Sequence, residues 1–268
     1  MKRQSVAVAA LVFAAFLIAS LAAAQETAQP RLFVLHQEQA RPGMTKQYEE
    51  ATKEYLSLVR QHHEKLPALQ FVVMVREDFR YSFLTPLENY GSLDKVQAGY
   101  GAMIHAVGQA KWDELMGRQG AATELIGQLI MLEYPGFSYV PAKPRLKADE
   151  ERYVRMDYHY VLPGREPDAM AVAQETVELY RKKGVPDGFR LFIVQVGPEM
   201  PLLIVMSSAR DAADFEEREK VNEELRGAEG RELSQRAYAV LRRFETYGAT
   251  VRPDLSIEPF KPKPGAGK

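Results

Sequence analysis

A seven-residue pattern that occurs twice decides how this 268-residue chain is divided. The first copy is PGFSYVP at residues 135–141, and the second, 118 positions later, is PDLSIEP at residues 253–259. The same shift places Glu114 and Leu115 on Glu232 and Leu233. A shift of 121 places Pro42-Gly43 on Pro163-Gly164. Because order, direction and two nearly equal offsets agree, we predict a tandem duplication.

Each copy shows the same order of predicted elements. A β-rich run ends at the Pro-Gly turn, and an amphipathic helix, two strands, a glycine-interrupted helical region and a last strand follow. The predicted strands are 32–38, 70–76, 81–85 and 125–134 in the first copy and 153–161, 189–196, 202–206 and 243–252 in the second. The interrupted helical regions are 92–116 and 211–239. By periodicity alone, residues 125–134 fit a helix equally well.

The order β-α-β-β-α-β predicts an α+β fold of two ferredoxin-like units, each a four-stranded sheet with both helices on one face. We expect the first unit at 31–142 and the second at 153–259, joined by the charged linker 143–152. Because the other face of each sheet is apolar, we expect the two sheets to pack face to face as an intramolecular α/β barrel. Such a barrel needs no second chain, so a monomer or a weak homodimer is expected.

At this level the chain resembles the dimeric α/β-barrel superfamily, which includes the antibiotic-biosynthesis monooxygenase, NIPSNAP and chlorite-dismutase-like families. The resemblance covers residues 31–259 and depends on the element order and on the repeated Pro-x-(Phe/Leu)-Ser ending. It is architectural, because no catalytic motif accompanies it. The resemblance implies that a small organic molecule or haem is held in the space between the sheets.

The first 24 residues are typical of an export signal. Lys2 and Arg3 precede an uncharged, Ala-rich stretch that ends in small residues, so we expect cleavage after Ala24 and a periplasmic or secreted protein. An uncleaved anchor is the alternative, since about 18 apolar residues can span a bilayer. No later run approaches that length, so no membrane contact is expected after cleavage. The Pro-, Lys- and Gly-rich tail at 260–268 is expected to be disordered.

Composition excludes several classes of function. With 46% hydrophobic and 26% charged residues, the chain has the composition of a folded globular protein. Its 35 Lys and Arg against 36 Asp and Glu give no field that would attract polyanions, so nucleic acid is not an expected partner. The chain has no cysteine, which excludes disulfides, thiol nucleophiles and zinc-cysteine sites.

The first predicted strand of each unit has one polar side. Alternation places His36 and Glu38 on one face of the first strand, and Arg155, Asp157 and His159 on one face of its counterpart. The shift of 121 matches His36 to Asp157 and Glu38 to His159. If the apolar side packs under the helices, we expect these five side chains to point into the space between the sheets.

Such a set is suited to more than one chemistry. A histidine near a carboxylate is a competent general base, so His36, Glu38, Asp157 and His159 are the candidate catalytic residues, with Arg155 as a ligand-binding residue. Two histidines and two carboxylates also suit Zn, Mn or Fe(II), although the spacing does not specify a metal and we assign none. The alternative is that these groups neutralise one another in a wet interior or face solvent.

Three further residues are candidates for a pocket wall. His105 and Trp112 lie in the interrupted helical region of the first unit, where the second unit has Glu223 and Gly230 instead. Tyr90 is a further candidate. The alternative for Trp112 is a place in the core, which is common for a tryptophan on a helix.

The sequence therefore predicts an exported barrel that binds a small organic molecule, with oxygenase-like or isomerising chemistry suggested by the resemblance. The alternative is a non-enzymatic structural or interaction protein of the cell envelope. A cavity between the sheets would favour the first, and an inter-sheet space filled by side chains would favour the second. Neither a substrate nor a cofactor is specified by the sequence.

Overall fold

The computed structural model describes residues 29–66 and 69–257. The predicted export signal at 1–24 and the predicted disordered tail at 260–268 lie outside the described residues. Within the described ranges, no helix is both long enough and apolar enough to span a bilayer.

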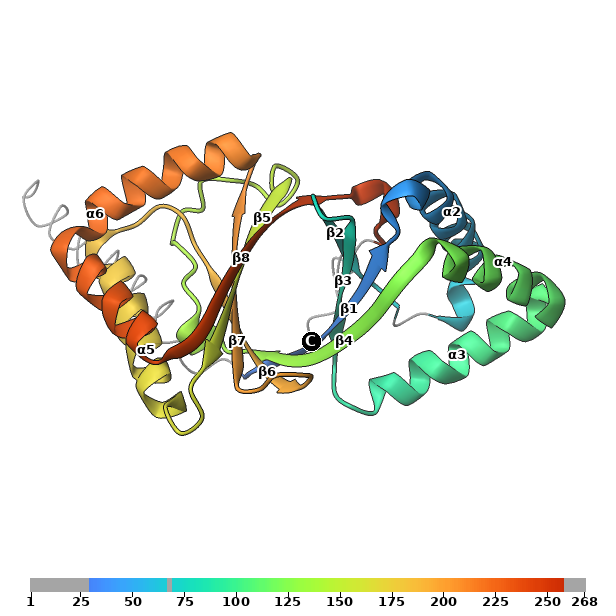
Figure 1. Ribbon diagram of the computed structural model, residues 1–268, viewed down its shortest axis with the longest axis horizontal. Coiled ribbons are helices and arrows are strands. Elements are labelled where there is room, and N and C mark those ends of the chain that lie inside the picture. Colours follow the sequence, from blue (N-terminus) through green and yellow to red (C-terminus); the bar gives the residue numbers. More distant parts are fainter. Residues whose placement is uncertain (1–28, 67–68, 258–268) are drawn as a thin grey trace, which may run out of the picture.

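Eight strands form one closed antiparallel barrel in the order β1-β3-β2-β8-β5-β7-β6-β4 (Figure 1). The strands are β1 (Arg31–Ala40), β2 (Val72–Arg76), β3 (Arg80–Leu87), β4 (Thr123–Glu133), β5 (Tyr153–Val161), β6 (Arg190–Val196), β7 (Leu202–Ala209) and β8 (Leu241–Val251). The first unit contributes four neighbouring strands, β4-β1-β3-β2, and the second contributes β8-β5-β7-β6. The pairs β2–β8 and β4–β6 join the two sheets, which confirms the predicted α+β barrel within one chain.

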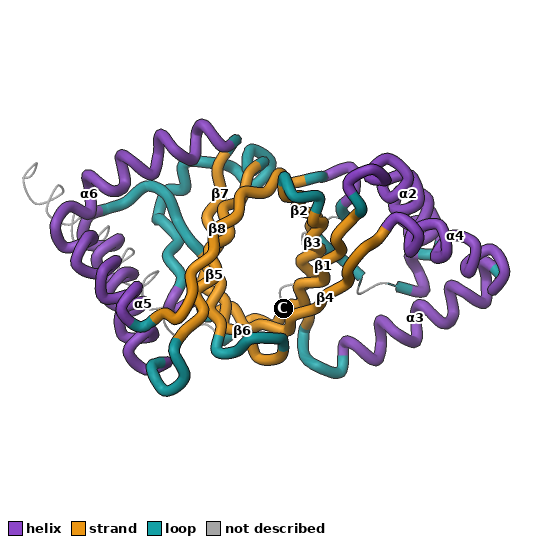
Figure 2. Tube along the Cα trace, in the orientation of Figure 1, coloured by secondary structure: helices purple, strands orange, loops and turns teal. Residues whose placement is uncertain are grey.

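The helices cover the outside of the barrel, as the ribbon and the tube both show (Figures 1 and 2). They are α2 (Thr45–Gln61), α3 (Ser92–Val107), α4 (Gln109–Ala122), α5 (Glu166–Lys183) and α6 (Ala212–Ala239). Gly108, at φ 94°, separates α3 from α4, and Gly227, at φ 60°, kinks α6. These are two of the glycine interruptions in the predicted helical regions. Residues 125–134, which fitted helix or strand, lie almost entirely in β4.

Strand register bears out the two sequence shifts. Glu38 pairs with Ile126 across β1 and β4, and the equivalent residues His159 and Phe244 pair across β5 and β8. The repeated seven-residue pattern also has an equivalent place in each unit, because each copy begins with a single 3₁₀ turn, at Pro135–Phe137 and at Pro253–Leu255.

The repeated serine ties each unit to the opposite one. The Ser138 hydroxyl accepts a hydrogen bond from the backbone N–H of Leu191 in β6, and the Ser256 hydroxyl accepts one from Val73 in β2, both at 2.9 Å. An isolated bridge follows each serine, Tyr139 with Phe189 and Phe71 with Ile257. In each unit, the repeated pattern therefore bonds to the sheet of the other unit and helps to close the barrel. This gives a physical reason for its presence in both copies.

One hydrophobic cluster with residues from all eight strands fills the barrel interior. Phe33 and Leu35 enter it from β1, and Met156 and Tyr158 enter it from β5. The Gln37 amide, on the same side of β1, donates to the Tyr158 hydroxyl at 3.3 Å and so links strands that are not neighbours. Odd positions of β1 and even positions of β5 therefore face inward.

The prediction that the polar side of these strands faces the space between the sheets is wrong. His36, Glu38, Arg155, Asp157 and His159 lie on the outer face, under the helices. Without partners, these ionisable groups would cost several kcal/mol each if they were buried in the barrel interior. On the outer face the helices offer partners, as Tyr48 of α2 does for Glu38 and Glu216 of α6 does for Arg155.

Candidate functional site

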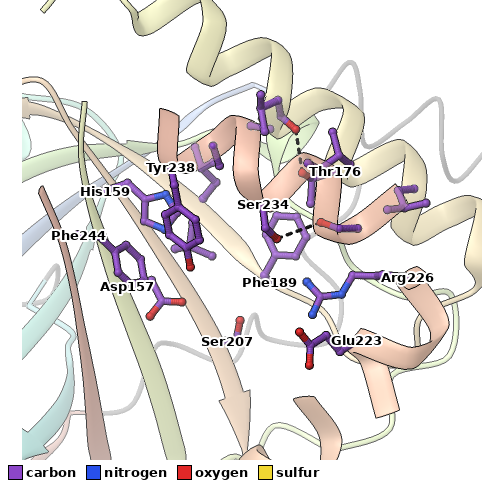
Figure 3. Close-up of a pocket in the computed structure, with 18 of the residues that line it drawn as sticks. Asp157, His159, Thr176, Phe189, Ser207, Glu223, Arg226, Ser234, Tyr238 and Phe244 are labelled. Carbon is purple, nitrogen blue, oxygen red and sulfur yellow. Dashed lines mark hydrogen bonds between the residues drawn. The ribbon is translucent and has the colours of Figure 1, made fainter. Parts of the chain in front are cut away.

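A cavity of ≈ 690 Å³ lies between the outer face of the second sheet and the helices α5 and α6 (Figure 3). Its volume is in the range of about 300 to 1,000 Å³ that is usual for small-molecule sites. The strands β5, β6, β7 and β8 form its floor. Apolar side chains make up much of the lining, among them Val172, Leu179, Phe189, Leu191, Leu203 and Val205.

The polar part of the floor is the β5 row Arg155, Asp157 and His159. These residues alternate along one strand, so successive side chains on this face are about 7 Å apart. In Figure 3 Asp157, His159 and Phe244 lie together at one side of the cavity, and Arg226 and Glu223 of α6 lie at the other. The cavity is therefore apolar along α5 and polar along β5.

His159 is a neutral imidazole at neutral pH. Burial lowers its pKa to about 4, because the charged form loses its water. Its ring meets Phe244 edge to face at 5.1 Å between centroids, and Phe244 meets Tyr238 of α6 at 5.5 Å. No described residue forms a hydrogen bond with the imidazole. The imidazole is therefore available to a ligand in the cavity.

Asp157 is held by one hydrogen bond and is otherwise open to the cavity. Its Oδ1 accepts from the Thr246 hydroxyl at 2.5 Å. Burial raises the pKa of the Asp157 carboxyl, and the hydrogen bond from Thr246 and the charge of Arg155 oppose that rise. A carboxylate with a raised pKa is a stronger base than an exposed one, which suits proton transfer.

Arg155 continues the row toward the N-terminal half of α6. Its guanidinium donates to Thr246 Oγ1 at 2.8 Å and to the Glu216 carboxylate at 2.7 Å, and it lies 4.7 Å from the centre of the Phe215 ring. The buried Nε atom has no hydrogen-bond partner among the described residues. Because Glu216 is 62% exposed, this ion pair is weak and the guanidinium remains available to a ligand.

The opposite wall of the cavity is formed at the kink of α6. Arg226 donates to the carboxylate of Glu219 and to the backbone carbonyl of Asn222, and it lies over the ring of Tyr180. Burial raises the pKa of Glu219, which the neighbouring Arg226 opposes. The kink at Gly227 turns the helix directly after this cluster, so that both halves of α6 line the cavity.

The two candidates from the first unit lie elsewhere. Glu38 accepts hydrogen bonds from His36 Nε2 at 3.0 Å, from the Tyr48 hydroxyl and from the Gln119 amide at 3.0 Å. Burial raises the pKa of Glu38, but the bonds from His36 and Tyr48 outweigh it, and the net shift is downward. The four predicted catalytic residues therefore do not share one enclosure. Asp157 and His159 line the cavity, and His36 and Glu38 do not.

The predicted pocket wall does not line this cavity either. Trp112 packs against Tyr55 and Tyr100 between the helices of the first unit, in the hydrophobic cluster on the outer face of that sheet. His105 is exposed on α3, and Tyr90 is 52% exposed in the turn before that helix.

Sequence reasoning missed the aromatic and α6 residues of the cavity. Phe244 and Thr246 were detectable, because the repeat alignment places them on β8 beside His159 and Asp157, and the register confirms both pairs. Tyr238 and Arg226 gave no comparable signal, since α6 alternates charges along its whole length. Their positions depend on the kink at Gly227.

The site does not have the form of a metal centre. Among residues 29–66 and 69–257, no three His, Asp or Glu side chains gather as a metal-binding group. The side chains of the interior cluster occupy the space between the sheets, which is the outcome expected to favour the structural or interaction alternative. Haem there, which the family resemblance implied, does not fit this chain for the same reason. A site for a small molecule therefore depends on the cavity outside the sheet.

Three solved structures place the fold among known ones. An anthrone oxidase-like protein aligns with a TM-score of 0.56 at 12% identity, covering 84% of this chain and 92% of that chain. A proposed monooxygenase from Lactobacillus acidophilus NCFM aligns with a TM-score of 0.51 at 8% identity, covering 86% and 97%. A mutant chlorite dismutase from Candidatus Nitrospira defluvii gives 0.52 at 11% identity, covering 86% and 95%.

No protein-family model matches this chain, and no curated protein does. The similar structures belong to the dimeric α/β-barrel superfamily, so the predicted resemblance is confirmed at the level of the fold. Because all three identities are low, they show the architecture alone.

Proposed function

We propose that this protein binds a small, largely apolar organic molecule in the second-unit cavity and oxidises it with molecular oxygen. The observation that carries the proposal is that Asp157 and His159 face one mainly apolar cavity, and that burial shifts both of their pKa values. An anthrone oxidase-like protein and a proposed monooxygenase share the fold, and their names point to reactions of this class.

The two residues have complementary roles in such a reaction. Asp157 takes the proton from an acidic C–H bond of the substrate, because burial raises its pKa. His159 stays neutral and donates an N–H to the oxygen on which negative charge develops. The resulting carbanion reacts with O₂. For a methylene that becomes a carbonyl, one oxygen atom enters the product and the other leaves as water with the two hydrogens.

The protein is also proposed to act outside the cytoplasm, in the periplasm or after secretion. The support is the charged, then apolar, then small-residue order of its first 24 residues.

Anthrone is a suitable first probe, because it is apolar and its methylene C–H is acidic. We expect oxygen uptake with anthrone, and a loss of about 100-fold or more in kcat/KM for Asp157→Asn and for His159→Gln. The matched controls are Asp113→Asn and His105→Gln, which alter exposed residues on α4 and α3. Unchanged turnover in both cavity variants would overturn the proposal. Anthrone binding without turnover would support the binding site but contradict the proposed oxidation.

A further inference from the structure

The first seven residues of β4 form an unpaired sheet edge. Residues 130–133 of β4 pair with β6, whereas residues 123–129 pair with β1 on one side and with no described strand on the other. Leu125 is 55% exposed and its neighbour Ile126 is 61% exposed. An edge of this kind presents free backbone N–H and C=O groups together with apolar side chains.

The equivalent edge in the second unit is protected by charge. Residues 241–248 of β8 pair with β5 alone, and β2 joins β8 only from Ala249 onward. Where β4 has Glu124 and Leu125, β8 has Arg242 and Arg243. Arg243 forms ion pairs with Glu199 and Glu245. Proteins commonly block edge pairing with such charges, and the β4 edge has only Glu124.

The β4 edge is complementary to itself. In an antiparallel pair with its two-fold axis at Ile126, Glu124 of one copy lies opposite Gln128 of the other, and Leu125 lies opposite Gly127. The glutamine amide can donate to the carboxylate. Gly127 has no side chain, and there is open space where a Cβ would be, so the larger Leu125 side chain is accommodated.

We propose that two copies of this chain pair antiparallel through residues 123–129 of β4, with the two-fold axis at Ile126. The pairing extends the sheet across the dimer and covers Leu125 and Ile126. It leaves the second-unit cavity accessible, because that cavity lies on the other unit, under α5 and α6.

Because the chain has no cysteine, single cysteines test this register without background. Directly opposed residues in an antiparallel pair are about 4.5 to 5.5 Å apart at Cα, within the range that a disulfide spans. We expect Ile126→Cys to form a disulfide-linked dimer under mild oxidation. Glu124→Cys and Gln128→Cys should cross-link poorly alone and efficiently when mixed. The control is Val140→Cys, at a site that is 58% exposed and lies outside β4.

Light scattering on the full mature chain gives a second readout. We expect the wild-type mass to be twice that of the chain, and Ile126→Lys to halve it, because opposed lysines repel at the dyad. Val140→Lys should leave the mass doubled. A wild-type monomer at micromolar concentration overturns the proposal. A dimer that Ile126→Lys does not weaken, or equal cross-linking at positions 126 and 140, overturns it as well.

Discussion

Equivalent positions on β1 and β5 show how hydrogen-bond partners decide the charge of a buried side chain. Glu38 receives three donors and keeps its charge, so that its pKa falls in spite of burial. His159, at the equivalent position, has no acceptor among the described residues to stabilise its charged form, and burial lowers its pKa to about 4, so it is neutral. After duplication, the first unit uses this position to bind its helices to the sheet, and the second leaves it open to a cavity.

The low pKa of His159 makes stability depend on pH. The folded pKa of about 4 lies below the unfolded value of 6.5, so the unfolded chain takes up the proton first as pH falls. The stabilising effect is complete above pH 6.5 and is lost as pH falls toward 4. At pH 5 the loss is about 2 kcal/mol relative to pH 7.

We expect urea unfolding to show this loss in the wild type and a smaller pH dependence in His159→Gln, whose side chain does not titrate. His105→Gln should behave like the wild type, because His105 is exposed. Parallel pH profiles for wild type and His159→Gln would contradict the lowered pKa.

At the scale of one element, α6 is weakly packed for its length. Of its 28 residues, all of them described, only Asn222 and Gly230 are buried. It is held mainly by ion pairs, such as Arg236 with Glu175 and Lys182 with Glu229. The cavity occupies the space that a packed helix would otherwise fill. A bound ligand would therefore supply the apolar contacts that α6 lacks.

The kink in α6 requires glycine at position 227. Its φ of 60° and ψ of −142° lie in a region that residues with a Cβ rarely adopt. An added Cβ would meet no atom within 4 Å, so the cost of Gly227→Ala comes from the backbone alone. We expect about 1 to 3 kcal/mol of destabilisation in chemical denaturation.

Gly117→Ala on α4 is the matched control, because it too has open space around the added carbon but an ordinary helical backbone. It should stabilise by about 0.5 to 1 kcal/mol. An equal effect of both substitutions would contradict backbone strain at Gly227.

Much of the element order was predictable from the sequence, but which face of each strand points into the barrel was not. The repeat, the Pro-Gly turns and the glycine breaks are local features, and they predicted the elements and the barrel. Alternation separated His159 from Tyr158 correctly. It could not show which side faces inward, because both faces of this sheet are covered. The apolar side faces inward because the barrel closes, and closure depends on contacts between residues far apart in the sequence.

The same long-range closure explains the outcome at the candidate site. Asp157 and His159 line a cavity, but on the face opposite to the predicted one, and His36 and Glu38 lie on the outer face of the other sheet, across the barrel interior. The sequence contained the residue types and their alternation. It did not reveal that Tyr48 and Gln119 would surround Glu38, nor that a kinked helix would stand away from His159.

At the scale of the whole molecule, the two units form one structure. They share one interior cluster, and Ser138 and Ser256 each accept a backbone hydrogen bond from the opposite unit. At the seam between β4 and β6, the carboxylate of Glu133 is buried and accepts two bonds from Arg190, at 2.9 and 2.7 Å, and one from Arg31. Burial opposes ionisation there, but these bonds keep the pKa of Glu133 lowered.

Cutting the linker should therefore not separate the halves. With a protease site inserted between Ala148 and Asp149, we expect the cleaved halves to elute together from a sizing column and to unfold in one transition, because neither sheet can bury its apolar face alone. Glu133→Gln should weaken their association, since it removes the buried charge that Arg190 and Arg31 share. Glu199→Gln, at an exposed ion pair away from this seam, should have little effect. Halves that elute separately, each with its native circular dichroism, would show that every unit has a sufficient core of its own.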